Sequence, residues 1–544
     1  MPPIAAPFSP SADRRSALDR AHIGDIRGAI GTVPAFDTGP RRTLRRRLLT
    51  FLAIAGPGLI VMTADNDAGT MSVFAQAGQG YGTRLLWVLV LLAPVLYIGQ
   101  EMAARLGAVT GTGHARLILE RFGRTWCAFS LGDLMVLNFA LLVTEFIGVA
   151  LSLAYFGISR YVAVPLAAGG LIALSSGGNF RRWESAMYVL VIADLSVIVL
   201  AILHHPRPEE IAIGLLPRLR DQGASSWMLL FVALIGTTIS PWQIFFQQSN
   251  VIDKRITPRW LAYERVDTAL GAFVFIAAAG AIMIACAAAF GHSAGHLHLL
   301  DAGMIAHALA RRSGGFAGAV FALALLNASL LGAGAVSLSS SYATSEVLGV
   351  KHSLHRRFKD AKVFHGCAAA LIAAAAGTVL IPGAPLGAIT TLVQALAGIL
   401  LPVALVLLLM LCNDSELLGP LTNSRWMNAV AVLAVAAILS LSTMLTITTV
   451  FPGAGIAEAA YATAAAFGAG GCLVAIVLFR RRRVTGPRQQ LTPWQRRTWS
   501  SPALERIAPA ERTRAGILTL ALLRGYTLVM IMLLLAKLGS LAAT

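Results

Sequence analysis

The chain has 544 residues, of which 56% are hydrophobic and only 13% are charged, and its mean hydropathy is +0.71. Soluble proteins carry about 25% charged residues, so this composition excludes an ordinary soluble protein and favours one embedded in a lipid bilayer. The net charge of +18 does not indicate nucleic-acid binding, because Lys and Arg lie in short clusters between apolar runs.

Residues 1–48 are polar, contain several prolines and end in a basic stretch. They hold no apolar core of the signal-peptide type before the first apolar run. We therefore expect a basic, disordered cytoplasmic tail.

Apolar stretches of about 18 residues or more follow, each long enough to cross a bilayer of about 30 Å as a helix. They predict thirteen transmembrane helices, at 49–76, 83–107, 128–156, 160–177, 183–204, 225–249, 266–290, 315–347, 362–381, 386–412, 427–450, 456–479 and 516–540. We expect residues 49–412 to form a ten-helix core. Residues 413–544 then add three helices and a basic cytoplasmic linker at 480–514.

Loop charges predict the orientation in the membrane. The segments rich in Lys and Arg are 105–124, 181–184, 253–265, 351–362 and 480–514. All of them fall on the cytoplasmic side if the N-terminus is cytoplasmic, as the positive-inside rule requires. The chain is thus predicted to be a multi-pass protein of the cell (inner) membrane.

Two predicted spans are interrupted by polar residues. The first contains a polar run from Thr63 to Thr70, and the sixth contains Gly236 to Trp242 with Pro241 between them. The two spans are five apart, as expected if helices 1–5 and 6–10 form two inverted repeats. Paired interrupted helices mark the midplane binding site of many transporters. Gly and Pro alone also kink membrane helices, but that does not explain the acids beside the first break.

Asp65 and Asp67 lie at membrane depth in the first break, where each charge costs about 2.5–3.5 kcal/mol. They must face a cavity, a cation or a partner. Unwound carbonyls and carboxylates suit hard divalent cations. We expect Asp67 and Thr70 to supply one half of the ligands of the metal ion. Thr237 and Ser240 would supply the other half. A structural carboxylate, bonded to the opposite helix break, is the alternative.

Four further polar residues are candidates for an ion pathway. Glu145 in the third helix either lines an ion path or caps a neighbouring helix. The same two roles are open for Gln394 in the tenth helix. Asn66 and Trp242 lie within the two breaks and complete this set.

Several short motifs resemble one family of membrane proteins. They are Gly56-Pro57-Gly58, Asp67-Ala68-Gly69-Thr70, Gln76-Ala77-Gly78, Ala104-Arg105-Leu106-Gly107, Glu145-Phe146-Ile147-Gly148, Gly236 to Pro241, Leu401-Pro402 and Asn413-Asp414. Together they resemble the Nramp family of divalent metal transporters over roughly residues 50–430. The resemblance implies a LeuT-type fold, alternating access and a metal site between helices one and six. It also implies that the metal is a transported substrate and that the protein is not an enzyme and needs no cofactor.

Departures from the family pattern bear on the choice of metal. Ser240 stands where the family has a Met, whose soft sulfur favours transition metals. Thr70 replaces an Asn and Ala68 a Pro, while Trp242 and Gln247 replace histidines. An Asp of the third helix is replaced by Leu142. An oxygen-only site suits Mg²⁺, which keeps several waters, and the lost groups are ones that could relay protons. The pattern resembles the Nramp-related magnesium transporters.

The sequence thus predicts transport of Mg²⁺ or Mn²⁺, with Fe²⁺ also open, without proton coupling. A proton-coupled Mn²⁺/Fe²⁺ symporter of the ordinary Nramp type is the first alternative. A metal-sensing membrane receptor is the second, although no soluble signalling domain is evident. No nucleophile elbow, HExxH or P-loop occurs, so an enzyme is not indicated. The oligomeric state stays open.

Overall fold

The structure is a computed structural model that describes residues 20–37, 39, 41–217, 230–231, 233–290, 302–382, 386–450 and 492–507, with single helical positions between 461 and 532. The sheet in this part of the chain is an antiparallel hairpin of β1 (Ile26–Arg27) and β2 (Thr32–Val33). Nearly everything else is helical, which confirms the predicted all-α polytopic architecture.

The helices follow one another along the chain as α1 (Leu44–Ile54), α2 (Pro57–Thr63), α3 (Ala68–Tyr81), α4 (Leu86–Thr110), α5 (His114–Phe122), α6 (Arg124–Tyr155), α7 (Arg160–Ser176), α8 (Phe180–Asp194), α9 (Ser196–Leu203), α10 (Pro208–Gly214), α12 (Pro241–Asp253), α13 (Leu261–Phe290), α14 (Ala302–Ser313), α15 (Gly315–Leu348), α16 (Lys362–Val379), α17 (Leu386–Cys412), α18 (Ser415–Leu418), α19 (Arg425–Val450) and α21 (Pro493–Arg497). Short 3-10 turns are η1 (Arg20–His22), η2 (Pro258–Trp260), η3 (Gly419–Leu421) and η4 (Leu504–Arg506). Residues 230–236, apart from 232, are also helical.

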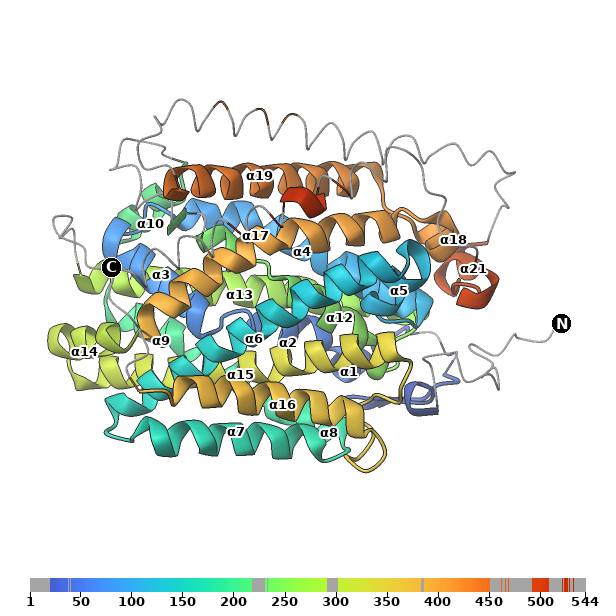
Figure 1. The fold of residues 1–544 in the computed structure, drawn as a ribbon, viewed down its shortest axis with the longest axis horizontal. Coiled ribbons are helices and arrows are strands. Elements are labelled where there is room, and N and C mark those ends of the chain that lie inside the picture. Colours follow the sequence, from blue (N-terminus) through green and yellow to red (C-terminus); the bar gives the residue numbers. More distant parts are fainter. Residues whose placement is uncertain are drawn as a thin grey trace.

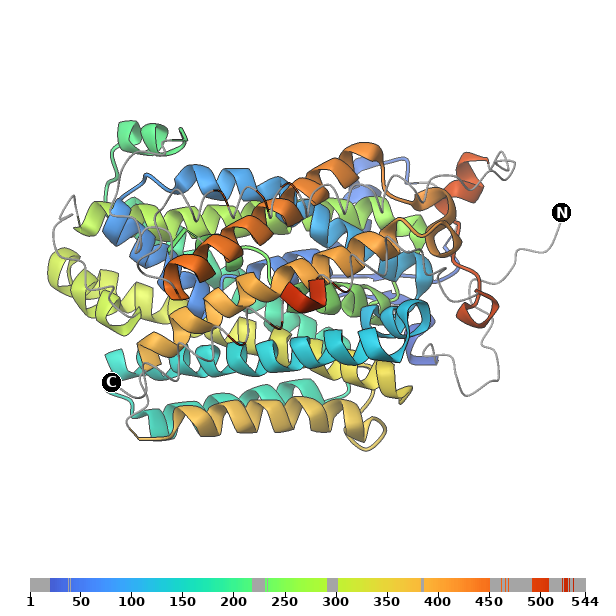
Figure 2. The same cartoon turned by 45° about the horizontal axis from the view of Figure 1, so that its top comes forward.

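The long helices run roughly parallel or antiparallel through the molecule (Figure 1). In the centre α6 packs along α15, and α2 and α3 pack along α13. Helices α7 and α16 form an outer layer at one edge, whereas α19 covers α17 at the other (Figures 1 and 2). The core lies between these layers and is built from side chains of nearly every helix.

Within the described residues, six helices are long and apolar enough to cross a membrane, or eight if each bent pair counts as one span. This number is below the thirteen predicted spans for local reasons. Helix α7 has only 17 residues, and the first and sixth spans are broken. The predicted spans 456–479 and 516–540 lie almost entirely outside the described residues.

The first predicted span, 49–76, is interrupted twice rather than once. The axes of α1 and α2 differ by 53°, because the chain turns at Gly56 with a φ of 144° that favours glycine. Pro57 then begins α2 at a position where its missing N–H costs nothing. The second interruption, between α2 and α3, is the predicted one. The core thus contains two broken spans, five spans apart, as the repeat hypothesis requires.

Segments that the sequence predicts to share one side of the membrane lie together at one end of the molecule. The backbone of Ser501 donates to the carbonyl of Val109, and Gly177 pairs with Arg357. The guanidinium of Arg255 donates to the carbonyl of Ala21. These contacts join the segment 480–514 to 105–124 and the segment 253–265 to the N-terminal region, and they place 351–362 beside the end of α7.

The expectation of a disordered tail up to residue 48 does not hold for its described part. Residues 20–37 contain η1 and the β1–β2 hairpin, and α1 already begins at Leu44. Ile26 and Val33 are buried in a small apolar cluster with α1, α4 and the end of α12. The physical reason is local: the two apolar side chains face the same way across the hairpin and have a partner surface to bury against.

Candidate metal site

The break in the first span is a short turn that ends on Asp67. Helix α2 ends at Thr63, and the amides of Asp65 and Asn66 bond back to its last turn. Asp67 is the N-cap of α3, where its Oδ1 accepts a hydrogen bond of 2.7 Å from the amide of Thr70. Aspartate is a preferred N-cap, and the positive end of the helix dipole favours its negative charge. The sequence Asp67-Ala68-Gly69-Thr70 therefore folds so that a carboxylate stands at the start of α3.

The break in the sixth span repeats this design with neutral groups. Ser240 is the N-cap of α12 and Pro241 its first residue. The Oε1 atom of Gln243 accepts from the backbone N–H of Ser240 at 3.2 Å and from Nε2 of Gln100 on α4 at 3.0 Å. The hydroxyl of Thr237 donates to the carbonyl of Leu234 at 3.1 Å, within its own helix. A second helix N-terminus is thus present without a charged side chain.

Three helices converge on the start of α3. From α17, Nε2 of Gln394 donates to Oδ1 of Asp67 at 3.4 Å. From α6, Oε2 of Glu145 accepts from the amide of Ala68 at 3.3 Å. From α15, Gly332 closes the site, because a Cβ there would collide with Oε1 of Glu145 and approach Cβ of Asp67. The structure therefore brings Glu145 and Gln394, two of the predicted pathway residues, to Asp67.

Asp65 and Asn66 point elsewhere. The carboxylate of Asp65 faces the side chains of Ser240 and Gln243 across the two breaks. The amide of Asn66 donates to Oδ2 of Asp194 on α8 at 3.1 Å. The predicted residues thus divide between an Asp67 group, an Asp65 group toward α12, and a side contact of Asn66 with α8.

Trp242 fills the space behind the second break. Its indole is fully buried, packs against the ring of Phe246 at 6.2 Å between centroids, and leaves Nε1 without a hydrogen bond. It therefore contributes one unused donor to the region.

Many buried polar atoms in this region have no hydrogen-bond partner among the described residues. They are both Oδ atoms of Asp65, Oδ1 of Asn66 and of Asp194, Oε1 of Glu145, Gln394 and Gln100, the hydroxyls of Thr63 and Thr70, Nε2 of Gln243 and Nε1 of Trp242. Buried polar groups are normally paired, so such a concentration requires an explanation. Most of these atoms are acceptors. A cation, or water that donates to them, would satisfy them.

The donor set fits a hard cation better than a soft one. In the described residues there is no group of three or more His, Cys, Asp and Glu arranged to hold a metal ion. The oxygens near the breaks come instead from one or two carboxylates, amides, hydroxyls and backbone carbonyls. Oxygen ligands with several retained waters are what Mg²⁺ and similar cations take.

A narrow recess of about 10 Å³, the space of about one water molecule, begins beside the Asp67 group. It is lined by Ala68, Ser72, Gln76, Thr144 and Thr390, among others, so its walls carry neutral polar groups. It lies between α3, α6, α14, α15 and α17. The recess ends at Ala68, the residue that follows Asp67 in the chain.

Sequence reasoning missed two glutamines that shape this region. Gln100 on α4 and Gln243 on α12 are both fully buried and hydrogen-bonded to one another. Gln100 lies inside an apolar run, as Gln394 does, so the argument applied to Gln394 would have found it. Gln243 follows Trp242 directly, just beyond the run from Gly236 to Trp242 that marks the second break in the sequence.

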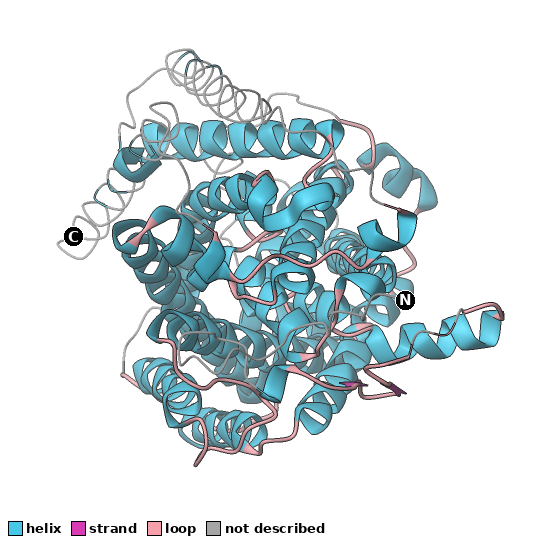
Figure 3. Ribbon diagram, turned by 90° about the vertical axis from the view of Figure 1, so that its right-hand side faces the viewer, coloured by secondary structure: helices cyan, strands magenta, loops and turns pink. Residues whose placement is uncertain are grey.

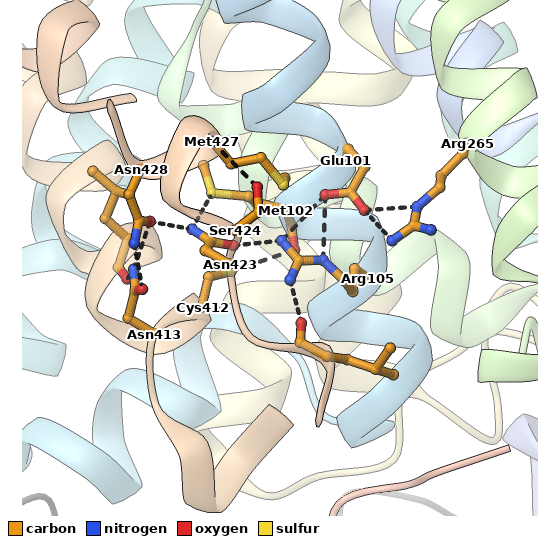
Figure 4. Close-up of polar contacts among 12 residues, drawn as sticks. Glu101, Met102, Arg105, Arg265, Cys412, Asn413, Asn423, Ser424, Met427 and Asn428 are labelled. Carbon is orange, nitrogen blue, oxygen red and sulfur yellow. Dashed lines mark hydrogen bonds and ion pairs between the residues drawn. The ribbon is translucent and has the colours of Figure 1, made fainter. Parts of the chain in front are cut away.

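Motifs far apart in the sequence also meet in a network of polar contacts (Figure 4). The guanidinium of Arg105 pairs with Glu101 at 3.2 Å and donates to Oδ1 of Asn423 at 2.5 Å. Asn423 bonds Asn428, which in turn exchanges hydrogen bonds with Asn413. The second-helix motif and the end of the tenth helix are thus parts of one buried network.

Known proteins share both this sequence and this fold. Residues 58–448 match the family described as natural resistance-associated macrophage protein-like, Nramp. The chain is 28% identical over 441 residues to the divalent metal cation transporter MntH of Ralstonia nicotianae, covering 78% of this chain and 92% of that protein. The MntH 1 protein of Pseudomonas aeruginosa is likewise 28% identical over 441 residues, covering 78% and 93%.

A solved structure supports the same assignment at the level of the fold. The crystal structure of the Eremococcus coleocola manganese transporter superposes with a TM-score of 0.65, at 20% identity, over 85% of this chain and 99% of that one. The likeness confirms the predicted LeuT-type architecture. The family match covers well over half of the sequence, from α2 to the end of α19, and this chain therefore belongs to the Nramp family.

Proposed function

We propose that this protein transports a divalent metal cation across a membrane by alternating access, with Asp67 as the principal ligand. One observation carries the proposal: the carboxylate of Asp67 caps α3 at the break of the first span, amid unpaired buried oxygens. Relatives that match over most of the chain are named divalent metal cation transporters, and a structural neighbour is a manganese transporter. Asp65, Thr70, Thr237 and Ser240 complete the proposed set of metal ligands.

The proposed cations are Mg²⁺ and Mn²⁺. The side chains of the five proposed ligands offer oxygen and neither sulfur nor imidazole, so no soft ligand among them selects a transition metal. The surplus of unpaired acceptors suits a cation that keeps part of its water, because each bound water offers two hydrogens to the protein. Ser240, with a short hydroxyl at the cap of α12, leaves space for such water.

We further propose that metal transport is not coupled to protons. Trp242 and Gln247 stand where the resemblance implies histidines, and neither side chain titrates near neutral pH. One observation favours the coupled alternative, an ordinary Nramp symporter: the Glu145 carboxyl lies beside Asp67 and could accept a proton there.

The proposed setting is the cell membrane, with the N-terminus in the cytoplasm. The basic segments that meet at the N-terminal end of the molecule support this orientation under the positive-inside rule.

A flux panel tests the function and the coupling together. Purified protein in proteoliposomes is given inward gradients of Mg²⁺, Mn²⁺, Fe²⁺ or Ca²⁺ while the internal pH is recorded. We expect Mg²⁺ and Mn²⁺ to enter without acidification of the lumen. Acidification in step with metal entry would establish the coupled alternative, and the absence of flux for all four cations would refute transport.

A further inference from the structure

The N-terminal strap, defined as residues 20–37, crosses the end of the molecule and touches four separate parts of the transporter. Figure 3 shows its two strands at the periphery, on the side that carries the N-terminus. Its Ile26 and Val33 are buried, and each is 3% exposed or less. They pack with apolar residues of α1, α4 and the α12–α13 connection: Ala53, Ile54, Ala104, Ala108, Val251, Ile256, Trp260 and Leu261.

Polar contacts fasten the strap to α8 and to the end of α12. The amide of Ala29 donates to Oε2 of Glu184 at 2.6 Å, and Arg181 donates back to the carbonyl of Ala29. Nε2 of His22 lies 3.8 Å from Oδ1 of Asp253 at the end of α12. At the strap's far end Arg41 pairs with Asp37 at 2.7 Å, which holds the pKa of that carboxyl below its usual range.

Arg255 is the most informative of these contacts. It follows α12 in a left-handed conformation, with a φ of 67°, where glycine is the usual residue. Its guanidinium donates from Nε to the carbonyl of Ala21 at 2.9 Å and from Nη1 to that of Asp25 at 3.1 Å. The backbone strain at Arg255 is thus offset by two hydrogen bonds of a charged donor, both made to the strap.

The parts that the strap joins include the base of the first broken helix. Helix α1 leads into α2 at Gly56, and Lys254 there bonds both the carbonyl of Ala55 and Glu184, the strap's partner on α8. Asp267 on α13 accepts from the amide of Gly58 at 2.7 Å. In a transporter with discontinuous helices, one bundle rocks against the other around the site. Tilting α2 away from α12 and α13 would separate surfaces that the strap now bridges.

The strap is not packed tightly along its whole length. A recess of about 200 Å³ remains between it and the ends of α4 and α12, lined by Ile23, Phe36, Gly107, Arg255 and Trp260, among others. Detachment would therefore break few contacts beyond the Ile26–Val33 cluster and the polar links of His22, Ala29 and Arg255.

We propose that the N-terminal strap is an autoinhibitory latch that holds the site closed toward the N-terminal side of the membrane. The inference rests on the proposed alternating-access function, since that function defines what opening means. Release of the strap shifts the equilibrium toward the state open on this side.

Accessibility of the α2–α13 contact reports on this opening. Thr268 on α13 is fully buried against Gly58, and its hydroxyl has no partner among the described residues, so Thr268→Cys is a mild change. Its reaction with a membrane-impermeant thiol reagent is measured in vesicles of either orientation, without metal. The same proteins without Thr268→Cys provide the background from the native cysteines.

Two variants release the strap by unrelated means. Arg255→Gly removes the guanidinium while relaxing the backbone at a positive φ, so the end of α12 should fold as well as before. Ile26→Asp places a charge in the apolar cluster and leaves Arg255 intact. Ile30→Asp is the matched control, because Ile30 lies in the same hairpin and is 56% exposed.

We expect both release variants to raise the labelling rate about tenfold from the N-terminal side, a factor that corresponds to ~1.4 kcal/mol. Ile30→Asp should leave the rate unchanged. Unchanged labelling in both release variants, or an equal rise in the Ile30→Asp control, would overturn the latch. Because no metal is present, these outcomes are independent of whether the protein transports metal.

Discussion

Asp67 has a structural role and a proposed chemical role, and two substitutions separate them. Asp67→Asn keeps an oxygen that can accept from the amide of Thr70 and so preserves the cap of α3. Asp67→Ala removes both the cap and the charge. Asn and Asp are equivalent N-caps, whereas Ala in their place costs about 1 kcal/mol of stability. We therefore expect thermal unfolding in detergent to be nearly unchanged for Asp67→Asn and measurably earlier for Asp67→Ala.

Both variants should lose transport. Removing a group that only supports a metal ligand already costs 10–100-fold in affinity, so losing the ligand's own charge should cost about 100-fold or more, ~2.7 kcal/mol. The assay is initial Mn²⁺ and Mg²⁺ uptake into proteoliposomes over a range of concentrations. Asp360→Asn, at an exposed loop position, is the control for a lost carboxylate. Uptake by Asp67→Asn at the wild-type rate and affinity would refute Asp67 as the ligand and leave it as a helix cap.

Other predictions follow from neighbouring contacts. Ser240→Met should raise Mn²⁺ uptake relative to Mg²⁺, because a thioether prefers the transition metal; an unchanged ratio of the two fluxes would show that Ser240 does not face the cation. A Cβ at Gly69 would displace the amide of Gln394, so Gly69→Ala should weaken metal affinity as much as Gln394→Ala does, by up to about 100-fold; wild-type affinity in both would exclude Gln394 from the site. Arg105→Met should lower the free energy of unfolding by about 3 kcal/mol, because it leaves buried hydrogen-bonding partners unpaired. Arg116→Met breaks a partly exposed pair with Glu120 and should change this free energy by less than about 1 kcal/mol. Equal unfolding temperatures for these two variants would contradict the assigned burial of the Arg105 network.

The architecture was predictable because its signals are strong and local. The structure contains the apolar runs of membrane length and the two polar interruptions five spans apart. Basic loops also lie close to one another in it. The double break of the first span was not foreseen, although Gly56 and Pro57 are plain in the sequence, since Gly and Pro also occur in continuous membrane helices. Their effect depends on the left-handed φ at Gly56, which is a property of the folded chain.

The sequence singles out Asp67 as a candidate ligand, but it does not show which polar groups surround that residue. An acid within an apolar run identifies Asp67 without any knowledge of neighbours. Whether Glu145, Gln394 or Asn66 points toward it depends on helix packing, and the structure directs the first two to the start of α3 and the third to Asp194. The fold of the strap was missed because Ile26 and Val33 are only two apolar residues in a polar segment, and their burial comes from surfaces that lie about 30 to 230 residues further along the chain.

The position of a bound cation tests the central claim most directly. Crystals of the protein grown with Mn²⁺ would be measured at the manganese absorption edge, so that anomalous density locates the ion. We expect one peak between the two helix breaks, within about 2.6 Å of a carboxylate oxygen of Asp67. Manganese found only at another place, with Asp67 still bonded to Thr70 and Gln394 alone, would contradict it.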